Sequence, residues 1–107
     1  MNNQEIIEQV RQRILDSVQL DRLILFGSRA RNDAREDSDV DLLVVMNTDA
    51  KPVYRSLPIR RALKDIHVSK DIVVYTPEEF QSCLPASASL AARAAEEGVE
   101  LYRSSTT

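Results

Sequence analysis

Three aspartates stand where two short apolar runs of the sequence begin. Asp39 and Asp41 open the run Val40 to Met46, and Asp71 opens the run Ile72 to Tyr75. Side chains alternate along a strand, so Asp39 and Asp41 should share one face, where their charges repel and need compensation. Carboxylate oxygens suit Mg²⁺, which completes its shell with water and phosphate oxygens. If the two strands are neighbours in compatible register, three carboxylates converge, as a two-metal phosphoryl- or nucleotidyl-transfer site requires.

The pair Gly27-Ser28 supplies a second element of such a site. It follows the apolar run Leu23 to Phe26, and ten residues separate Ser28 from Asp39. Glycine at the end of a strand lets the backbone approach a phosphate closely. The amides at the start of a following helix, together with the Ser28 hydroxyl, would donate to that phosphate. The arginines that follow can add positive charge for a triphosphate; they are Arg29, Arg31 and Arg35.

Each of these residues also has an ordinary structural interpretation. Asp39 and Asp41 could be solvated carboxylates at the entrance of a strand, and Asp71 could belong to a simple turn. Ser28 could serve only as a helix cap, although a cap can also donate to phosphate. The arginines of the segment 29–31 could lie on the surface or form salt bridges. The combined spacing favours the catalytic interpretation for the aspartates and leaves the two arginines open between the roles.

Apolar periodicity predicts the elements that must hold these residues. Helices are expected over Gln4–Val18, Tyr54–Ile66, Pro77–Cys83 and Ser87–Glu97, with a short one N-capped by Ser28 and ending near Asn32-Asp33. Strands are expected over Leu23–Phe26, Val40–Met46, Ile72–Tyr75 and Val99–Tyr102. Helices that alternate with short aliphatic strands indicate an α/β (α+β) fold, with a small mixed β-sheet flanked by helices.

Length and composition limit the classes of protein that fit. The 107 residues are expected to form one domain spanning 1–107, with a frayed tail at 104–107. A net charge of −3 does not favour direct, stable nucleic-acid binding. Cys83 is the only cysteine, and the polar N-terminus does not resemble a signal peptide, so a cytoplasmic location is expected. No apolar run is long enough for a membrane span.

The arrangement of Gly-Ser, ten residues and Asp-x-Asp resembles the signature of the polymerase-β-like nucleotidyltransferase superfamily. The strings FGSRAR (26–31) and SDVDL (38–42) are similar to its small prokaryotic branch, the minimal nucleotidyltransferase (MNT) domains. The segment KDIVV (70–74) resembles the strand that carries the third carboxylate, and AEEGVELY (95–102) resembles the typical MNT C-terminus. Asn32 replaces the usual glycine after Arg-Ala-Arg. Asparagine tolerates a left-handed backbone, so the turn is expected to persist.

The resemblance implies the nucleotidyltransferase fold and a Mg²⁺-dependent transferase of the EC 2.7.7 type. Its two Mg²⁺ ions would be held by Asp39, Asp41 and Asp71, which form the catalytic set. ATP is the nucleotide donor that the resemblance implies. The residues expected to bind that nucleotide are Gly27, Ser28, Arg29 and Arg31.

The resemblance also implies a partner. MNT domains of this size are commonly paired with a HEPN-domain ribonuclease toxin in a two-gene toxin–antitoxin system, and some neutralise it by AMPylation, the transfer of AMP to a toxin tyrosine. The expected function is therefore that of a protein adenylyltransferase antitoxin. A non-catalytic antitoxin or nucleotide-binding module that blocks its partner sterically is the alternative. Transfer to a small molecule is disfavoured because those relatives use an additional domain. A homodimer and a hetero-oligomer both remain open.

Overall fold

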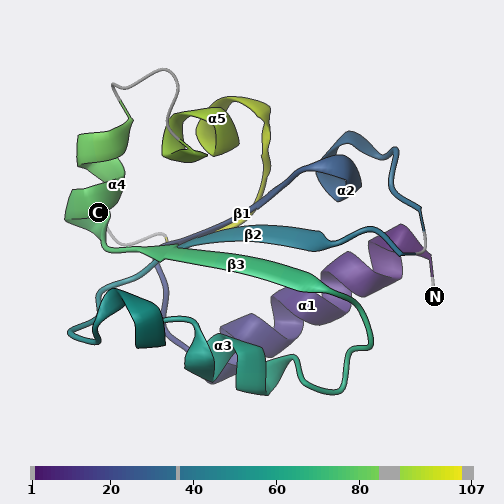
Figure 1. The fold of residues 1–107 in the computed structure, drawn as a ribbon, viewed down its shortest axis with the longest axis horizontal. Helices are drawn as coiled ribbons and strands as arrows, with labels where there is room; N and C mark the ends of the chain where they lie inside the picture. Colours follow the sequence, from purple (N-terminus) through teal and green to yellow (C-terminus); the bar gives the residue numbers. More distant parts are fainter. Residues whose placement is uncertain (1, 36, 85–89, 105–107) are drawn as a thin grey trace.

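The expected α/β architecture is present in the computed structural model, which describes residues 2–35, 37–84 and 90–104. The strands are β1 (Arg22–Phe26), β2 (Val40–Val45), β3 (Lys70–Tyr75) and β4 (Val99–Arg103). The helices are α1 (Asn3–Ser17), α2 (Ser28–Arg31), α3 (Leu57–Ala62), α4 (Pro77–Cys83) and α5 (Leu90–Glu97), with a 3₁₀ turn η1 (Pro52–Tyr54). Together they form a mixed sheet flanked by helices (Figure 1), so the predicted fold class is confirmed.

The sheet has the strand order β3-β2-β1-β4. Strand β1 pairs antiparallel with both β2 and β4, whereas β2 and β3 run parallel. As a result β1 ends at the same edge of the sheet at which β2 and β3 begin. The Gly-Ser turn and the acidic strand starts, far apart in the sequence, therefore meet at one edge.

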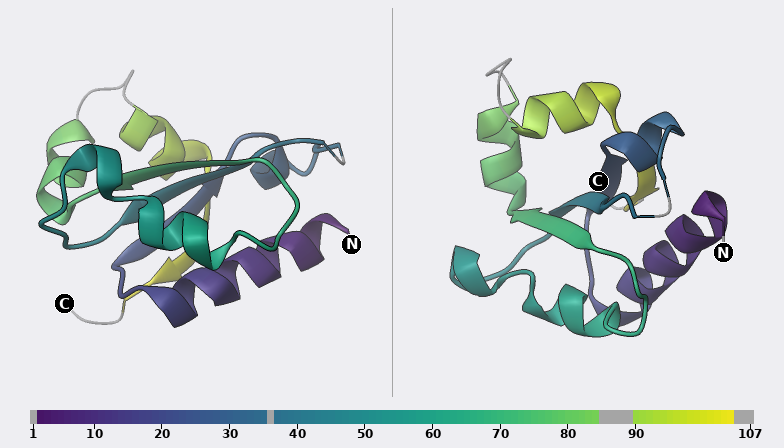
Figure 2. Two further views of the ribbon diagram at one scale, coloured as in Figure 1. Left: turned by 60° about the horizontal axis from the view of Figure 1, so that its bottom comes forward. Right: turned by 45° about the vertical axis from the view of Figure 1, so that its right-hand side comes forward.

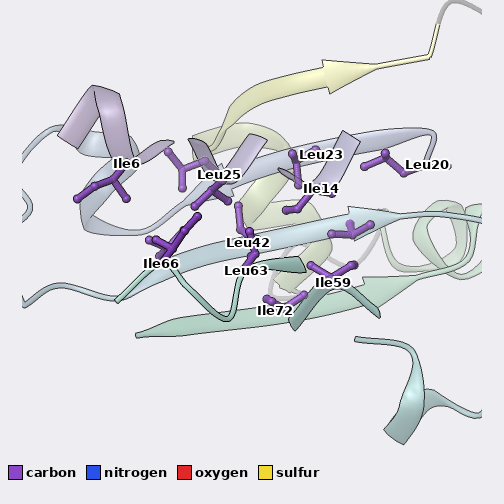
Figure 3. Packing of buried hydrophobic residues seen from close by; sticks show 13 residues of the cluster. Ile6, Ile14, Leu20, Leu23, Leu25, Leu42, Ile59, Leu63, Ile66 and Ile72 are labelled. Carbon is purple, nitrogen blue, oxygen red and sulfur yellow. The ribbon is translucent and has the colours of Figure 1, made fainter. Parts of the chain in front are cut away.

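Helices cover both faces of the sheet. Helices α1 and α3 lie on one face, and α4 and α5 lie on the other (Figures 1 and 2). The face toward α1 and α3 holds the larger core, in which Val10, Ile14, Leu42, Ile59 and Leu63 are all fully buried (Figure 3). The opposite face buries a smaller cluster around Phe80.

The alternation of side chains along β2 decides which face of the sheet carries Asp41. Val40, Leu42 and Val44 belong to the larger core, whereas Leu43 and Val45 belong to the cluster under α4 and α5. Asp41 therefore faces the α5 side of the sheet. The apolar residues on either side in the sequence fix this orientation, because a slip of one residue would bury the carboxylate in the larger core.

Several predicted boundaries change. The single helix expected over 54–66 is instead the turn η1 followed by the shorter α3, in which Pro58 occupies the first turn. Proline fits there because the first amides of a helix have no intrahelical partner. Helix α4 begins as predicted, with Thr76 and Glu79 forming a capping box. The parts of the predictions that fall on 85–89 and 105–107 lie outside the described residues.

Within the described ranges, every helix is too short or too polar to cross a membrane.

Candidate active site

Asp41 and Asp71 lie directly opposite each other at the start of the two parallel strands β2 and β3. Residues opposite each other on parallel strands point to the same face, so both carboxylates are directed toward the α5 side. Asp39 precedes β2 and is exposed. The structure thus places the two strands as neighbours in the register that the three-carboxylate hypothesis required.

The electrostatics of Asp41 show that the three aspartates interact. Burial raises the pKa of the Asp41 carboxyl, and the negative charges of Asp71 and Asp39 raise it further, while Arg31 acts in the opposite direction. Like charges disfavour the ionised form of a neighbouring carboxyl. This edge of the sheet therefore holds an excess of negative charge that a bound cation would neutralise.

Gly27 makes room for the Asp41 carboxylate. Its φ of 75° lies in the region that favours glycine. A Cβ atom at this position would lie 2.2 Å from Oδ2 of Asp41, which is far inside van der Waals contact. The prediction that Ser28 caps helix α2 is wrong, because Gly27 occupies the N-cap position and Ser28 is the first helical residue. The Ser28 amide still has no intrahelical acceptor at this position.

Arg29 points into the protein rather than toward the carboxylates. The residue is 3% exposed. The guanidinium donates from Nε (3.1 Å) and Nη2 (2.7 Å) to the Ser38 carbonyl, and from Nη1 (2.9 Å) to Oδ1 of Asn3. Asn3 Nδ2 in turn donates to the Arg29 carbonyl (3.2 Å). Arg29 therefore joins helix α1 to the loop that ends at Asp39, and it holds that loop in position.

Arg31 and Asn32 end helix α2 beside the site. Asn32 adopts a left-handed conformation, with φ 63° and ψ 29°, so the expected turn is formed without glycine. The Arg31 side chain is exposed and contacts Asp33 at 3.4 Å. Of the two arginines singled out in the sequence, Arg31 is the one whose charge acts on Asp41.

Helix α5 forms a wall of the site that the sequence did not reveal. A cavity of about 250 Å³ is lined by Phe26, Gly27, Arg31, Asp41, Leu90, Arg93, Ala94 and Glu97. The last four recur at the helical spacing i, i+3, i+4 and i+7, which indicates one face of a helix. That spacing predicts that the four residues share one face of a helix. Only the packing of α5 on β1 shows that this face is directed toward the site.

The side chains at this edge of the sheet are of the kind that binds a hard divalent cation. Among the described residues, no group of three His, Cys, Asp or Glu side chains converges closely enough to hold an ion. The pair Asp41–Asp71 is fixed by strand register, and exposed Asp39, in the loop before β2, is near enough for its charge to raise the pKa of Asp41. All available donors are carboxylate oxygens, which fits Mg²⁺ with water and phosphate oxygens in its remaining positions.

A larger hollow, of about 500 Å³, lies at the opposite end of β3. Its lining residues include Val74, Tyr75, Cys83 and the ion-paired Arg55 and Glu79. None of the three aspartates lines it. The acidic edge, with its cavity beside Gly27, is therefore the candidate active site.

Comparison with known proteins agrees with this geometry. The family model described as "Nucleotidyltransferase domain" matches residues 4–101. A candidate nucleotidyltransferase from Sulfolobus solfataricus has a similar structure, with a TM-score of 0.63, 19% identity, and coverage of 94% of this chain and 83% of that one. No curated protein sequence matches the chain.

Two toxin–antitoxin structures share the fold. One, solved with AMP-PNP, has a TM-score of 0.61 and 19% identity over 98% of this chain and 76% of that one. The other, a mutant MntA-HpeT complex, has a TM-score of 0.57 and 17% identity over 98% and 75%. The family match covers nearly the whole described fold and supports transferase activity, so the chain belongs to the nucleotidyltransferase domain family.

Proposed function

We propose that this protein transfers AMP from ATP to a tyrosine hydroxyl of a HEPN ribonuclease toxin and thereby neutralises it. The observation that carries the proposal is the register of β2 and β3, which sets Asp41 beside Asp71 at the edge where the Gly27 turn lies. The similar toxin–antitoxin structures, one of them solved with the ATP analogue AMP-PNP, support the biological setting and the nucleotide.

Asp39, Asp41 and Asp71 would hold two Mg²⁺ ions. When bound, these ions would neutralise phosphate charge and favour the ionised form of the acceptor hydroxyl. The Gly27 backbone and the Ser28 amide and hydroxyl would receive the phosphate chain, and exposed Arg31 would add a positive charge to it. Arg29 would not contact the nucleotide. It would position the loop that carries Asp39, because its guanidinium binds the Ser38 carbonyl.

The transfer step forms a bond between the tyrosine oxygen and the α-phosphorus of ATP and breaks the bond from that phosphorus to pyrophosphate. The acceptor proton must leave as this bond forms. Asp71 lies on β3, the outer strand of the sheet, and its side chain is exposed. An incoming protein acceptor can therefore reach this carboxylate from the side of the outer strand, and we assign it the role of proton acceptor.

The experiment is to incubate the protein with α-labelled ATP, Mg²⁺ and the product of the neighbouring gene. Label that appears on a tyrosine of the partner and is lost in Asp39→Asn and Asp41→Asn supports the proposal. Toxin activity is measured in the same mixtures, by cleavage of RNA. Neutralisation should require both ATP and the intact aspartates.

The alternative function, a non-catalytic antitoxin that blocks its partner sterically, predicts that neutralisation does not depend on the aspartates. It draws support from the absence, among the described side chains, of a closed three-ligand group. If the Asp39→Asn and Asp41→Asn variants still neutralise the toxin and no label is transferred, the protein acts as a cap on its partner. The two functions are therefore separated by a single pair of substitutions.

A further inference from the structure

Arg93 is the residue of helix α5 that best matches the chemistry of the site. It lines the same cavity as Arg31, Gly27 and Asp41. In the part of the chain that the structure describes, the Arg93 side chain makes no hydrogen bond or ion pair, and it is exposed. By contrast, Arg29 is engaged with the protein and Arg31 contacts Asp33.

We propose that Arg93 is a binding residue for the nucleotide phosphate chain, so that α5 acts as the second wall of the nucleotide site. This inference rests on the proposed use of ATP. Asp41 lies on the same lining, and a cation held there would neutralise its charge. Two guanidinium groups from separate helices would then face one small cavity and attract an anion. A triphosphate is such an anion, and arginine is well suited to bind phosphate because it presents several donors in a fixed plane.

The size of the cavity favours the phosphate end of the nucleotide. Its volume of about 250 Å³ is below the range of roughly 300–1,000 Å³ usual for whole small-molecule sites. Gly27 and Asp41 line it, and these are the residues assigned to phosphate and metal. The nucleoside would then extend beyond the cavity, and Arg93 would contact the β- and γ-phosphates, which AMP lacks.

Glu97 provides an internal control of the opposite sign. It lines the cavity one helical turn after Arg93, and its carboxylate is not paired with any described residue. A negative charge there opposes an anionic ligand. Removing the charge of Glu97 should therefore strengthen nucleotide binding, whereas removing the charge of Arg93 should weaken it.

The experiment measures AMP-PNP and AMP binding by calorimetry in the presence of Mg²⁺, using the full chain and four variants. Arg93→Gln should weaken AMP-PNP binding about tenfold, as expected for the loss of a charged hydrogen bond, and AMP binding much less. Arg93→Lys should recover part of the affinity, and Glu97→Gln should strengthen AMP-PNP binding about two- to threefold. The matched control is Arg61→Gln, which removes an exposed arginine from α3 on the opposite face and should change nothing. Thermal unfolding of each variant shows whether the fold is intact.

The outcomes separate this inference from the proposed function. If the wild type binds AMP-PNP and transfers AMP but Arg93→Gln binds as the wild type does, the role of Arg93 is disproved and the function stands. If Arg93→Gln weakens AMP and AMP-PNP binding equally and lowers the melting temperature, Arg93 is structural and the inference is also overturned. If the wild type binds no nucleotide, both proposals fail together.

Discussion

Gly27 lies so close to Asp41 that a side chain on residue 27 would displace the Asp41 carboxylate. The two residues come from neighbouring strand ends, since Phe26 pairs with Asp41 across β1 and β2. A Cβ atom on residue 27 would lie 2.2 Å from Oδ2 of Asp41 and 3.2 Å from its Cγ. The glycine therefore does more than allow a tight turn, because it keeps open the space in which the carboxylate is held.

This relationship predicts the effect of Gly27→Ala. The alanine would be strained at a φ of 75° and would displace the Asp41 carboxylate. We expect a loss of about 1–3 kcal/mol in the free energy of unfolding and a large loss of AMP transfer. Urea unfolding and label transfer measure the two effects. The reverse result, a variant that unfolds and transfers AMP as the wild type does, would show that the Asp41 carboxylate is not held against this turn.

The acidic edge should lower the stability of the metal-free protein. Burial and the charges of Asp71 and Asp39 raise the pKa of Asp41, so the ionised carboxylate is disfavoured in the folded state. Asp41→Asn should therefore raise the unfolding free energy by up to about 1 kcal/mol, or roughly 4–8 °C in Tm, when EDTA is present. The same substitution should reduce AMP transfer by more than about a hundredfold, since even residues behind metal ligands contribute about 10- to 100-fold.

Added Mg²⁺ should reverse this order of stability. An ion that binds only the folded state stabilises it by mass action, so Mg²⁺ should raise the Tm of the wild type. The Asp41→Asn variant, which lacks a ligand, should respond much less. Equal shifts in the two proteins would argue against a metal at Asp41.

Arg29 should contribute to stability and to the position of Asp39 rather than to phosphate binding. Its buried guanidinium bonds to the Ser38 carbonyl and to Asn3. Arg29→Ala should cost about 2–3 kcal/mol, because hydrogen bonds to a charged group are lost and a carbonyl is left without its partner. Arg29→Lys should not recover this lost stability, since lysine cannot bond both acceptors in the same plane. Exposed Arg35 provides the control: Arg35→Ala should leave the unfolding free energy within about 0.5 kcal/mol of wild type.

The ion pair between Arg55 and Glu79 predicts how stability depends on pH. The two side chains are 2.6 Å apart, and the side chain of Arg55 is 11% exposed. The hydrogen bond from Arg55, followed by that from the Thr76 amide, lowers the pKa of Glu79 below its ordinary value. A carboxyl with a lower pKa in the folded state stabilises the protein above its unfolded pKa of about 4.3, and this contribution is lost as pH falls through the folded value.

Glu79→Gln should therefore lower the Tm at pH 7. The gap in Tm between this variant and the wild type should become smaller as the pH falls. Glu78→Gln is the matched control, because Glu78 precedes it in α4 and forms no ion pair within the described ranges. Melting curves between pH 3 and pH 7 test the prediction. If the gap between Glu79→Gln and wild type stays constant over this range, the pair does not account for acid sensitivity.

The sequence predicted the strands and the acidic residues well because both depend on local patterns. Aliphatic runs marked β1 to β3, and the capping box at Thr76 marked the start of α4 within a residue. The pairing of Asp41 with Asp71 could be stated only as a condition, since strand register depends on contacts between distant segments.

Other features of the site could not be inferred from local pattern. The Arg29 side chain is directed inward by Asn3 and Ser38, which flank it at a distance in sequence, so its type alone left two roles open. The wall formed by Arg93 and Glu97 depends on how α5 packs across β1. An exposed, charged helix face carries no sequence signal that says which other element it faces.

Asn32 tests whether the turn after Arg31 needs glycine. Its φ of 63° is positive, and its amide donates to the Ser28 carbonyl, which closes helix α2. Asparagine accepts this conformation at little cost, whereas a β-branched side chain does not. Asn32→Gly should therefore retain AMP transfer and change the unfolding free energy by less than about 0.5 kcal/mol. Asn32→Val should destabilise the protein by about 1–2 kcal/mol and weaken nucleotide binding, because the strain displaces Arg31. A valine variant with wild-type stability and affinity would show that the left-handed turn is not required to position Arg31.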